Sequence, residues 1–348
     1  MSIEYTKADT STREALYDAL LTFWDQRWTD EFQREFMAWR YERRLDGETF
    51  VAMSGAKCIG LVDTFVRPYF IDGRQVVIRE PCDWFCLPGN RGVGMRLMKW
   101  MATQEEPLLG VGLPKTAISI ARRMNWTRLL DTYDFVLPIT VRRVLGAVVR
   151  KAHLGNGSVT RFLPRWRLRS DAAWRKYREM DGEIEELAPA QWPEEDLSGP
   201  YADYGVAPIV TRSYVQWLAA CPSSLGNVFL LSFRIGGEIV GLSICRIERS
   251  KVGCKARLIH IQSFRPGLRT LQWMIAENVQ RASLHAAESF HCRSSCPVTN
   301  AALLSLGSRR TAADAVFMDL KGLERPSGPV NMTFVRGDDA MIPSLIGE

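Results

Sequence analysis

The sequence lacks long apolar runs. No stretch of about 18 uncharged apolar residues occurs, and residues 1–7 show neither the basic start nor the apolar core of a secretory signal. We therefore expect a soluble, cytoplasmic protein that does not span a membrane. The chain has 348 residues, 46% of them hydrophobic, which is long enough for two domains with a core each.

Compact cysteine pairs are also scarce. The eight cysteines are scattered, and several lie inside apolar segments, which is typical of reduced core residues rather than of a disulfide framework. A zinc site needs compact sets of thiolate and imidazole ligands. Residues 291–296 contain one histidine and two cysteines at such a spacing, but no second compact pair lies nearby. We predict no metal site.

Two common phosphate-binding patterns are missing as well. The dinucleotide fingerprint needs Gly-x-Gly-x-x-Gly, whereas the glycine-rich segment at residues 88–98 has the order Gly-x-x-Gly-x-Gly. A P-loop needs Gly-Lys-Ser/Thr, whereas Gly94 is followed by Met95-Arg96. The segment therefore fits neither class of nucleotide site.

What the glycine-rich segment offers is a turn from a strand into a helix. Residues 76–87 are rich in β-branched and aromatic types, which predicts a strand, and methionines recur at helical spacing after Gly94. Gly92 and Gly94 lack a Cβ, so backbone N–H groups there can approach an anion at the positive end of a helix dipole. A pyrophosphate suits this geometry, although ordinary turn chemistry also places glycines at helix starts.

The spacing resembles motif A of the GNAT superfamily of N-acetyltransferases, where Gln/Arg-x-x-Gly-x-Gly/Ala follows a strand ending in Val-x-Pro. Cys86-Leu87-Pro88 and Asn90-Arg91-Gly92-Val93-Gly94 fall on that pattern, with Gly89 where the family has Gln or Arg. The resemblance covers residues 3–140. It implies an α/β fold, with a central mixed sheet flanked by helices, and acetyl-CoA or another acyl-CoA as cofactor.

The resemblance also implies where the cofactor lies. Backbone amides at about residues 90–95 would hold the pyrophosphate, strand amides just before the loop would face the thioester carbonyl, and the pantetheine would lie in a gap between two splayed strands. The implied cofactor-binding residues are Phe85, Cys86, Leu87, Asn90, Arg91, Gly92, Val93, Gly94, Met95, Val111 and Gly112.

Acyl transfer to an amine needs a base, donors for the oxyanion and an acid for the departing thiolate. The family often uses a carboxylate on the strand before the loop as base, so Asp83 and Glu80 are candidates, with a salt-bridged or solvated strand end as the structural alternative. Strand alternation predicts that Asp83 shares a face with Phe85, and Trp84 with Cys82 and Cys86. Apolar surroundings would raise the pKa of Asp83.

The acid that protonates the departing thiolate and the binding site of the acceptor are harder to place. Ala121 stands where the family usually has a tyrosine as acid, which leaves Ser119 or water. Residues 36–41 carry a Phe-x-x-Trp-x-Tyr stretch similar to that of family members associated with capsule or exopolysaccharide clusters. This implies a small amine or amino sugar as acceptor, although aromatics at helical spacing also fit a core. The predicted substrate-binding residues are Trp28, Trp39 and Tyr41.

The two halves of the chain resemble each other. Residues 229–243 repeat the strand, turn and strand of residues 50–63, and Trp273 falls where Trp100 does, but only residues 264–268 stand in place of the glycine loop. This is similar to the tandem arrangement of mycothiol-synthase-like and Fem-type transferases. The predicted domains are a GNAT-like cofactor domain at 1–140, a basic helical connector at 141–180, and a degenerate GNAT-like domain at 181–348.

The net charge of +6 is unevenly distributed. Residues 142–178 hold many arginines and lysines against only Asp171. Such a segment can bind nucleic acid, but a solvated helical face explains it as well, and we favour the latter. Three functions stay open: an acetyl-CoA-dependent N-acyltransferase, a GNAT-like CoA-binding scaffold without turnover, and a Fem-type transferase of aminoacyl or long-chain acyl groups.

Overall fold

The computed structural model describes most of both halves of the chain. The described residues are 2–24, 30–43, 47–111, 113, 115–141, 144–145, 167–168, 174–178, 181–194, 204–222, 226–250, 253–265 and 267–333. The predicted basic connector at 141–180 lies largely outside them, so its helical character stays a prediction.

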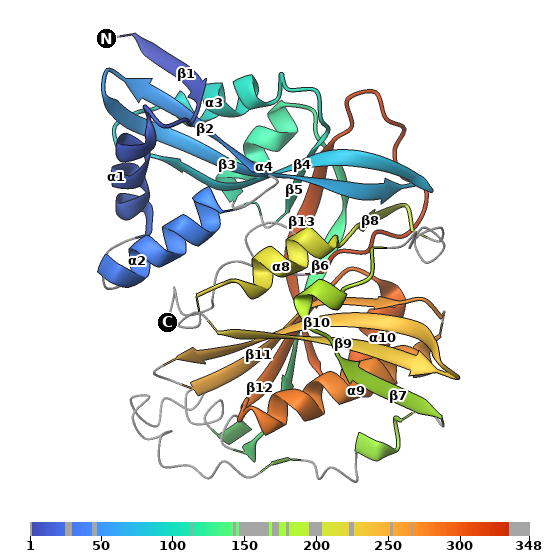
Figure 1. The fold of residues 1–348 in the computed structure, drawn as a ribbon. Helices are drawn as coiled ribbons and strands as arrows, with labels where there is room; N and C mark the ends of the chain where they lie inside the picture. The colour runs from blue at the N-terminus through green and yellow to red at the C-terminus, as the bar shows by residue number, and fades with distance from the viewer. Residues whose placement is uncertain are drawn as a thin grey trace.

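Both halves follow the same succession of hairpin, strand and helix (Figure 1). The elements of the first half are β1 (Ile3–Lys7), α1 (Arg13–Trp24), α2 (Asp30–Met37), the π-helical turn η1 (Ala38–Glu42), β2 (Gly47–Ser54), β3 (Lys57–Ile71), β4 (Arg74–Cys86), α3 (Val93–Met101), β5 (Leu108–Val111), α4 (Lys115–Arg123) and β6 (Thr127–Pro138). Those of the second half are β7 (Gly182–Glu186), the short 3-10 helix η3 (Pro189–Gln191), β8 (Val206–Pro208), α8 (Arg212–Ala219), β9 (Asn227–Ile235), β10 (Glu238–Ser250), β11 (Gly253–Ser263), α9 (Leu268–Leu284), β12 (Ser289–Ser294), α10 (Pro297–Ser305) and β13 (Arg309–Asp319).

One continuous mixed sheet joins the halves. Among the described strands the order is β1-β2-β3-β4-β5-β13-β6-β12-β11-β10-β9-β7, with β8 paired to β3. The last strand of each half crosses over, because β13 pairs with β5 of the first half and β6 pairs with β12 of the second. The α/β fold with a helix-flanked mixed sheet is confirmed. The domain boundaries at 140 and 181 stay a prediction, and the exchanged strands were not foreseen.

The internal repeat is visible where a helix packs over each central hairpin. Gly60 on β3 lies under α3, and a Cβ added there would come within 3.2 Å of Val93 Cγ1. Gly241 on β10 lies under α9, and a Cβ there would come within 2.6 Å of Met274 Sδ. The Ile/Val-Gly pair therefore recurs in both halves because the following helix needs to approach the strand closely.

One hydrophobic core lies between the halves. Side chains of α1, η1 and α8 pack there against strands of both halves, and Figure 1 shows α8 between them. Trp39 of η1 and Trp217 of α8 stack with 4.5 Å between ring centroids. Each indole N–H donates to the backbone carbonyl of the other tryptophan, at 2.8 and 3.0 Å. This reciprocal pair links the two halves.

Strand β4 carries a β-bulge at Asp83. Phe85 pairs with Leu61 whereas Cys82 pairs with Asp63, so the β4 segment has one residue more than its β3 partner. Asp83 adopts a left-handed φ of 42°, a conformation that aspartate tolerates better than most residues. The bulge re-aims the side chains at the end of β4.

The bulge also overturns one prediction from strand alternation. Cys82 does not share a face with Trp84 and Cys86, because the extra residue moves it to the face of Phe85. Cys82 and Phe85 belong to the core between the halves, whereas Trp84 and Cys86 pack under α3. The loop-proximal part of β4 is therefore packed on both sides.

Candidate functional site

Strands β4 and β5 separate soon after they meet. Among the described residues they pair only at Arg79 and Leu108, where the Arg79 N–H donates to the Pro107 carbonyl at 2.9 Å. Beyond this point β5 pairs with β13, and β4 continues to Cys86 with β3 as its partner. The two strands thus leave a splayed edge of the kind that the resemblance implied.

The end of β4 presents a backbone donor to this edge. The Leu87 N–H donates to the Ile59 carbonyl at 3.0 Å and so points toward β3. Because amide directions alternate along a strand, the N–H of Cys86 points away from β3, toward the splayed side, and that of Phe85 points back to β3. Of the two amides expected to face a thioester carbonyl, the geometry therefore favours Cys86.

The turn between β4 and α3 leaves further N–H groups unused. Gly89 and Gly92 have φ of 87° and 81°, and Gly92 is the residue that precedes the first helical turn. Among the described residues, the backbone N–H groups of Arg91, Gly92 and Met95 have no hydrogen-bond acceptor in the backbone. They lie at the positive end of the α3 dipole, so the corner suits a pyrophosphate.

The two glycines of the predicted cradle serve different purposes. A Cβ at Gly92 would meet nothing within 4 Å, so this position needs glycine for its left-handed backbone. A Cβ at Gly94 would lie 2.9 Å from Cys86 Sγ and 3.1 Å from Trp84 Nε1. Gly94 is therefore required for the close packing of α3 on β4, a reason that the sequence pattern did not reveal.

Asp83 lies at the centre of a buried polar cluster. Its Oδ2 accepts hydrogen bonds from Arg40 Nε at 2.8 Å and from the Tyr41 hydroxyl at 2.6 Å. Both side chains of the Arg40–Asp83 ion pair are almost fully buried. Burial raises the pKa of the Asp83 carboxyl, and the charge of Arg40 opposes this rise. A carboxyl with a raised pKa can act as a base near neutral pH.

Glu80, the other predicted base, is fully engaged. Its Oε2 pairs with Arg67 Nη2 at 2.8 Å, and its Oε1 accepts a hydrogen bond from the Tyr69 hydroxyl. The side chains of both charged partners are buried. This corresponds to the structural alternative, a salt-bridged carboxylate, and the Arg40–Asp83 pair is of the same kind. We retain Asp83 as the candidate base because its hydrogen-bond partner Tyr41 lines a pocket.

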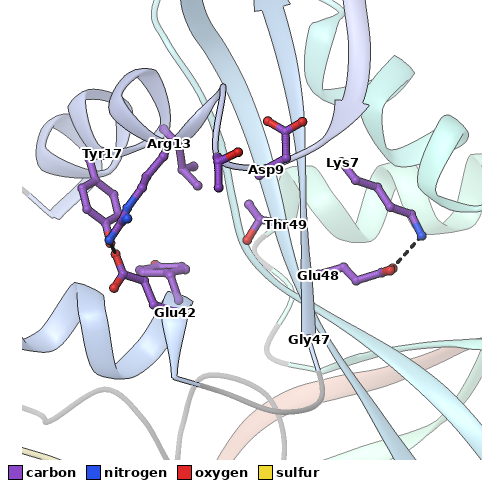
Figure 2. Close-up of a pocket in the computed structure, with 12 residues that line it drawn as sticks. Lys7, Asp9, Arg13, Tyr17, Glu42, Gly47, Glu48 and Thr49 are labelled. Carbon is purple, nitrogen blue, oxygen red and sulfur yellow. Dashed lines mark hydrogen bonds and ion pairs between the residues drawn. The ribbon is translucent and has the colours of Figure 1, made fainter.

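A pocket of about 400 Å³ borders this cluster at the starts of α1 and β2 and the end of η1. Figure 2 shows Arg13 and Tyr17 of α1 directed at Glu42, and Lys7 directed at Glu48. The pocket wall therefore carries charges of both signs, most of them paired.

Two residues of the pocket wall reach the carboxylates behind it. Tyr41 lines the pocket and donates to Asp83, and Thr49 lines it and donates to Asp63 Oδ1 at 2.6 Å. Tyr41, predicted as a substrate-binding residue, thus connects the pocket with Asp83. Burial raises the pKa of the Tyr41 hydroxyl well above its usual range, and the charge of Asp83 adds to the rise.

Trp39, predicted to bind substrate, lies in the core between the halves, so its substrate-binding role stays a prediction. Its side chain is 0% exposed, and its ring and N–H are both taken by Trp217. The aromatic residues of this stretch follow the core alternative, because η1 needs an apolar face against α8. Trp28 lies outside the described residues, so its role stays a prediction.

The remaining predicted residues are only partly placed. Ser119 is exposed on α4, whereas Ala121, two residues further along the same helix, is buried in a core that it shares with α3. The Val111 backbone pairs with Val316 of β13, and Gly112 lies outside the described residues. The Asn90 amide group donates to the Leu87 carbonyl at 3.1 Å and so braces the turn rather than reaching outward.

One group of residues at the bulge has the composition of a metal site. Ligand atoms of Asp63, Cys82 and Asp83 lie within 4.8 Å of one another. Each carboxylate already accepts hydrogen bonds, Asp83 from Arg40 and Asp63 from Thr49. A guanidinium next to the cluster opposes a cation, so these residues fit a hydrogen-bonded network better than a metal.

Sequence reasoning missed the partners of Asp83. Arg40 lies within the aromatic stretch 36–41 but was given no role of its own, and Asp63 and Thr49 received none either. A charged residue within an otherwise buried aromatic stretch was the available signal, since a buried arginine requires a partner.

Among the described helices, none is long and apolar enough to cross a membrane.

Comparisons with known proteins support the fold only through structure. No protein-family model matches the sequence, and no curated protein matches it. A GCN5-related N-acetyltransferase from Anabaena variabilis ATCC 29413 has a similar structure, with a TM-score of 0.61, 13% identity, and coverage of 93% of this chain and 75% of that one.

Two further solved structures are similar over more than 90% of this chain. Saccharomyces cerevisiae N-myristoyltransferase with bound myristoyl-CoA has a TM-score of 0.55 at 11% identity, over 93% of this chain and 84% of that one. A tandem GNAT protein from the clavulanic acid biosynthesis pathway has a TM-score of 0.52 at 11% identity, over 91% and 98%. The chain has the GNAT fold in tandem, as predicted.

Proposed function

We propose that this protein is an acyl-CoA-dependent N-acyltransferase that transfers an acetyl or other acyl group to a small amine. The observation that carries the proposal is the β4–α3 corner, where the Cys86 N–H faces a splayed strand edge and unused N–H groups gather at a helix start. The fold similarity to acyltransferases supports it. The length of the transferred acyl group is tested by comparing acetyl-CoA with longer acyl-CoAs.

The corner residues would hold the donor. The N–H groups of Arg91, Gly92 and Met95 would bind the pyrophosphate, and the Cys86 N–H would donate to the thioester oxygen as it gains negative charge. When bound, acyl-CoA supplies the activated thioester. Its acyl carbon forms a bond to the amine nitrogen as the carbon–sulfur bond breaks.

Asp83 would take the proton that the amine loses. Its pKa is raised by burial, which favours proton uptake, while Arg40 keeps the carboxylate oriented. Tyr41 joins Asp83 to the pocket of Figure 2, so we assign this hydroxyl to the path by which the proton returns to solvent. The departing thiolate takes a proton from water.

Binding of acetyl-CoA by isothermal calorimetry tests the donor site. Gly92→Asp places a carboxylate where the pyrophosphate would lie and should weaken binding more than tenfold. Gly73→Asp is the matched control, because Gly73 has a similar φ of 77° and equally open surroundings. No binding by the wild type, or equal weakening in both variants, would refute the proposal.

One observation favours a second function, a CoA-binding scaffold without turnover. Ala121 is 3% exposed within a core, and it stands where the resemblance places the tyrosine acid. Thiol release from acetyl-CoA and longer acyl-CoAs with a panel of amines distinguishes the two. Acyl-CoA binding without amine-dependent thiol release would establish the scaffold.

A further inference from the structure

Arg246 on β10 is a fully buried arginine that has no hydrogen-bond partner among the described residues. Its side chain is 0% exposed, and none of its three guanidinium nitrogens has a hydrogen-bond partner among the residues that the structure describes. Other buried arginines behave differently, since Arg40 faces Asp83 and Arg67 faces Glu80. The nearest acid along β10, Glu248, pairs with Arg257 at 3.1 Å.

An unpaired buried guanidinium is costly. Arginine stays protonated in proteins, so it cannot escape the cost by losing its proton. Burial of such a charge without hydrogen-bond partners is costly, and a bound anion that accepts those hydrogen bonds would offset the cost. The position is therefore better explained by a ligand than by packing.

Arg246 faces the core between the halves. Its neighbour two residues earlier, Ile244, belongs to that core, whereas the flanking Cys245 and Ile247 belong to the core under α9. Burial raises the pKa of the Cys221 thiol, and Arg246 is the leading charge that opposes the rise. Arg246 therefore lies near the end of α8.

Contacts along α8 connect Arg246 with the candidate base. Tyr214 also experiences the charge of Arg246, and its ring packs 5.6 Å from Trp217. Trp217 stacks on Trp39, the residue before Arg40, which pairs with Asp83. Arg246 and Asp83 thus project into the same interior, from the second and the first half.

We propose that Arg246 binds a carboxylate of the acceptor, so that the acceptor is an amine that also carries a carboxylate, as an amino acid does. This inference rests on the proposed function. One guanidinium balances one negative charge and fits a carboxylate in a two-pronged hydrogen bond. A phosphate would bring nearly two charges, and Arg67, the other cation that acts on Tyr214, is already paired with Glu80. The second half thus selects the acceptor.

The test compares Arg246→Met with Arg293→Met. Arg293 is also buried, but it pairs with Asp134 at 2.8 Å, so its loss should lower the melting temperature. The loss of an unpaired charge at Arg246 should leave the melting temperature unchanged or raise it. A lower melting temperature for Arg246→Met than for Arg293→Met would overturn the inference, because it would reveal a structural role.

Ligand binding supplies a second readout. Thermal shift with L-amino acids, their α-carboxamides and glucosamine 6-phosphate should show stabilisation of the wild type by amino acids only. Arg246→Met should lose that shift and raise the KM for the amino acid more than tenfold in thiol release. Its acetyl-CoA affinity should not change.

The outcomes separate the two proposals. Failure of the wild type to bind acetyl-CoA defeats the proposed function. Normal acetyl-CoA binding together with equal use of amino acids and carboxamides, or with unchanged KM in Arg246→Met, defeats the inference alone. Stabilisation by glucosamine 6-phosphate and not by amino acids would replace the carboxylate with a phosphate and overturn it as well.

Discussion

The corners where β4 turns into α3 and β11 turns into α9 are two versions of one structure. In both, a glycine on the preceding strand, Gly60 or Gly241, lets the helix approach. The first corner spans residues 87–92 and contains two left-handed glycines, whereas the second spans only 264–267. Both corners therefore keep their packing glycines, and the longer first turn alone carries the unused N–H groups on which the proposed anion site rests.

The strands before the corners differ in charge. Asp83 and His260 occupy equivalent positions in the two strands. Asp83 lies three residues before Cys86, which pairs with Gly60, and His260 lies three residues before Ser263, which pairs with Gly241. Asp83 takes part in a buried ion pair, whereas burial lowers the pKa of His260 to about 4 and keeps its ring neutral. The first half holds a charged group at the position that is neutral in the second.

Substitution of Asp83 and of His260 should produce the largest difference between the two halves in the free energy of unfolding. Asp83→Leu removes the carboxylate that faces Arg40 and should cost about 3–5 kcal/mol of unfolding free energy. His260→Leu replaces a neutral buried ring and should change it by about 1 kcal/mol. Urea unfolding of both variants measures the contrast.

The double variant Arg40→Met/Asp83→Leu is the control for the first prediction. It removes both charges and should recover most of the stability lost by Asp83→Leu. Equal losses for Asp83→Leu and His260→Leu, or no recovery in the double variant, would show that the ion pair does not distinguish the two halves.

Acid should weaken the second half through His260. Its folded pKa of about 4 lies below the ordinary value of 6.5, so the unfolded chain binds the proton more readily. This stability is present above pH 6.5 and is lost as the pH falls toward 4, by about 3 kcal/mol. Unfolding measured at pH 7, 5.5 and 4 should show a smaller loss for His260→Gln than for the wild type. Parallel pH profiles would contradict this.

Alanine at the packing glycines should produce the smallest effect. Gly94→Ala and Gly241→Ala each place a methyl group against packed atoms and should cost about 1–3 kcal/mol. Only Gly94→Ala disturbs the helix that would bind the donor, so only this variant should weaken acetyl-CoA binding. Calorimetry beside urea unfolding measures both quantities, and weakened binding in Gly241→Ala would show that the two corners are coupled.

The sequence predicted the corner well because its signals are local. The strand before Pro88, the helix start near Gly92 and the shorter second turn all follow from residue types and spacing within short windows. The tandem fold followed from a repeat of such windows. The strand exchange between β6 and β13 did not, because pairing between distant strands leaves no periodic trace in the chain.

The predicted site residues divide in the same way. The sequence proposed Phe85 and Cys86 from their place before the glycine turn, and the backbone geometry then favoured Cys86. Trp39 could not be separated from the core, because aromatic spacing is the same for a core and for a ligand site. Cys82 was placed on the wrong face because a single extra residue in β4 reverses the alternation.

The sequence by itself determined where a strand, a glycine turn and a helix start succeed one another, and that this unit occurs twice with only one complete turn. These properties depend on backbone freedom and local periodicity. The tertiary structure alone decided that Arg40 pairs with Asp83, that Trp39 stacks on Trp217 and that Arg246 is buried with no hydrogen-bond partner among the residues that the structure describes. Such contacts depend on which segments, distant in sequence, pack against each other and exclude water. Burial raises the free-energy cost of an unpaired charge and strengthens the interaction between paired charges.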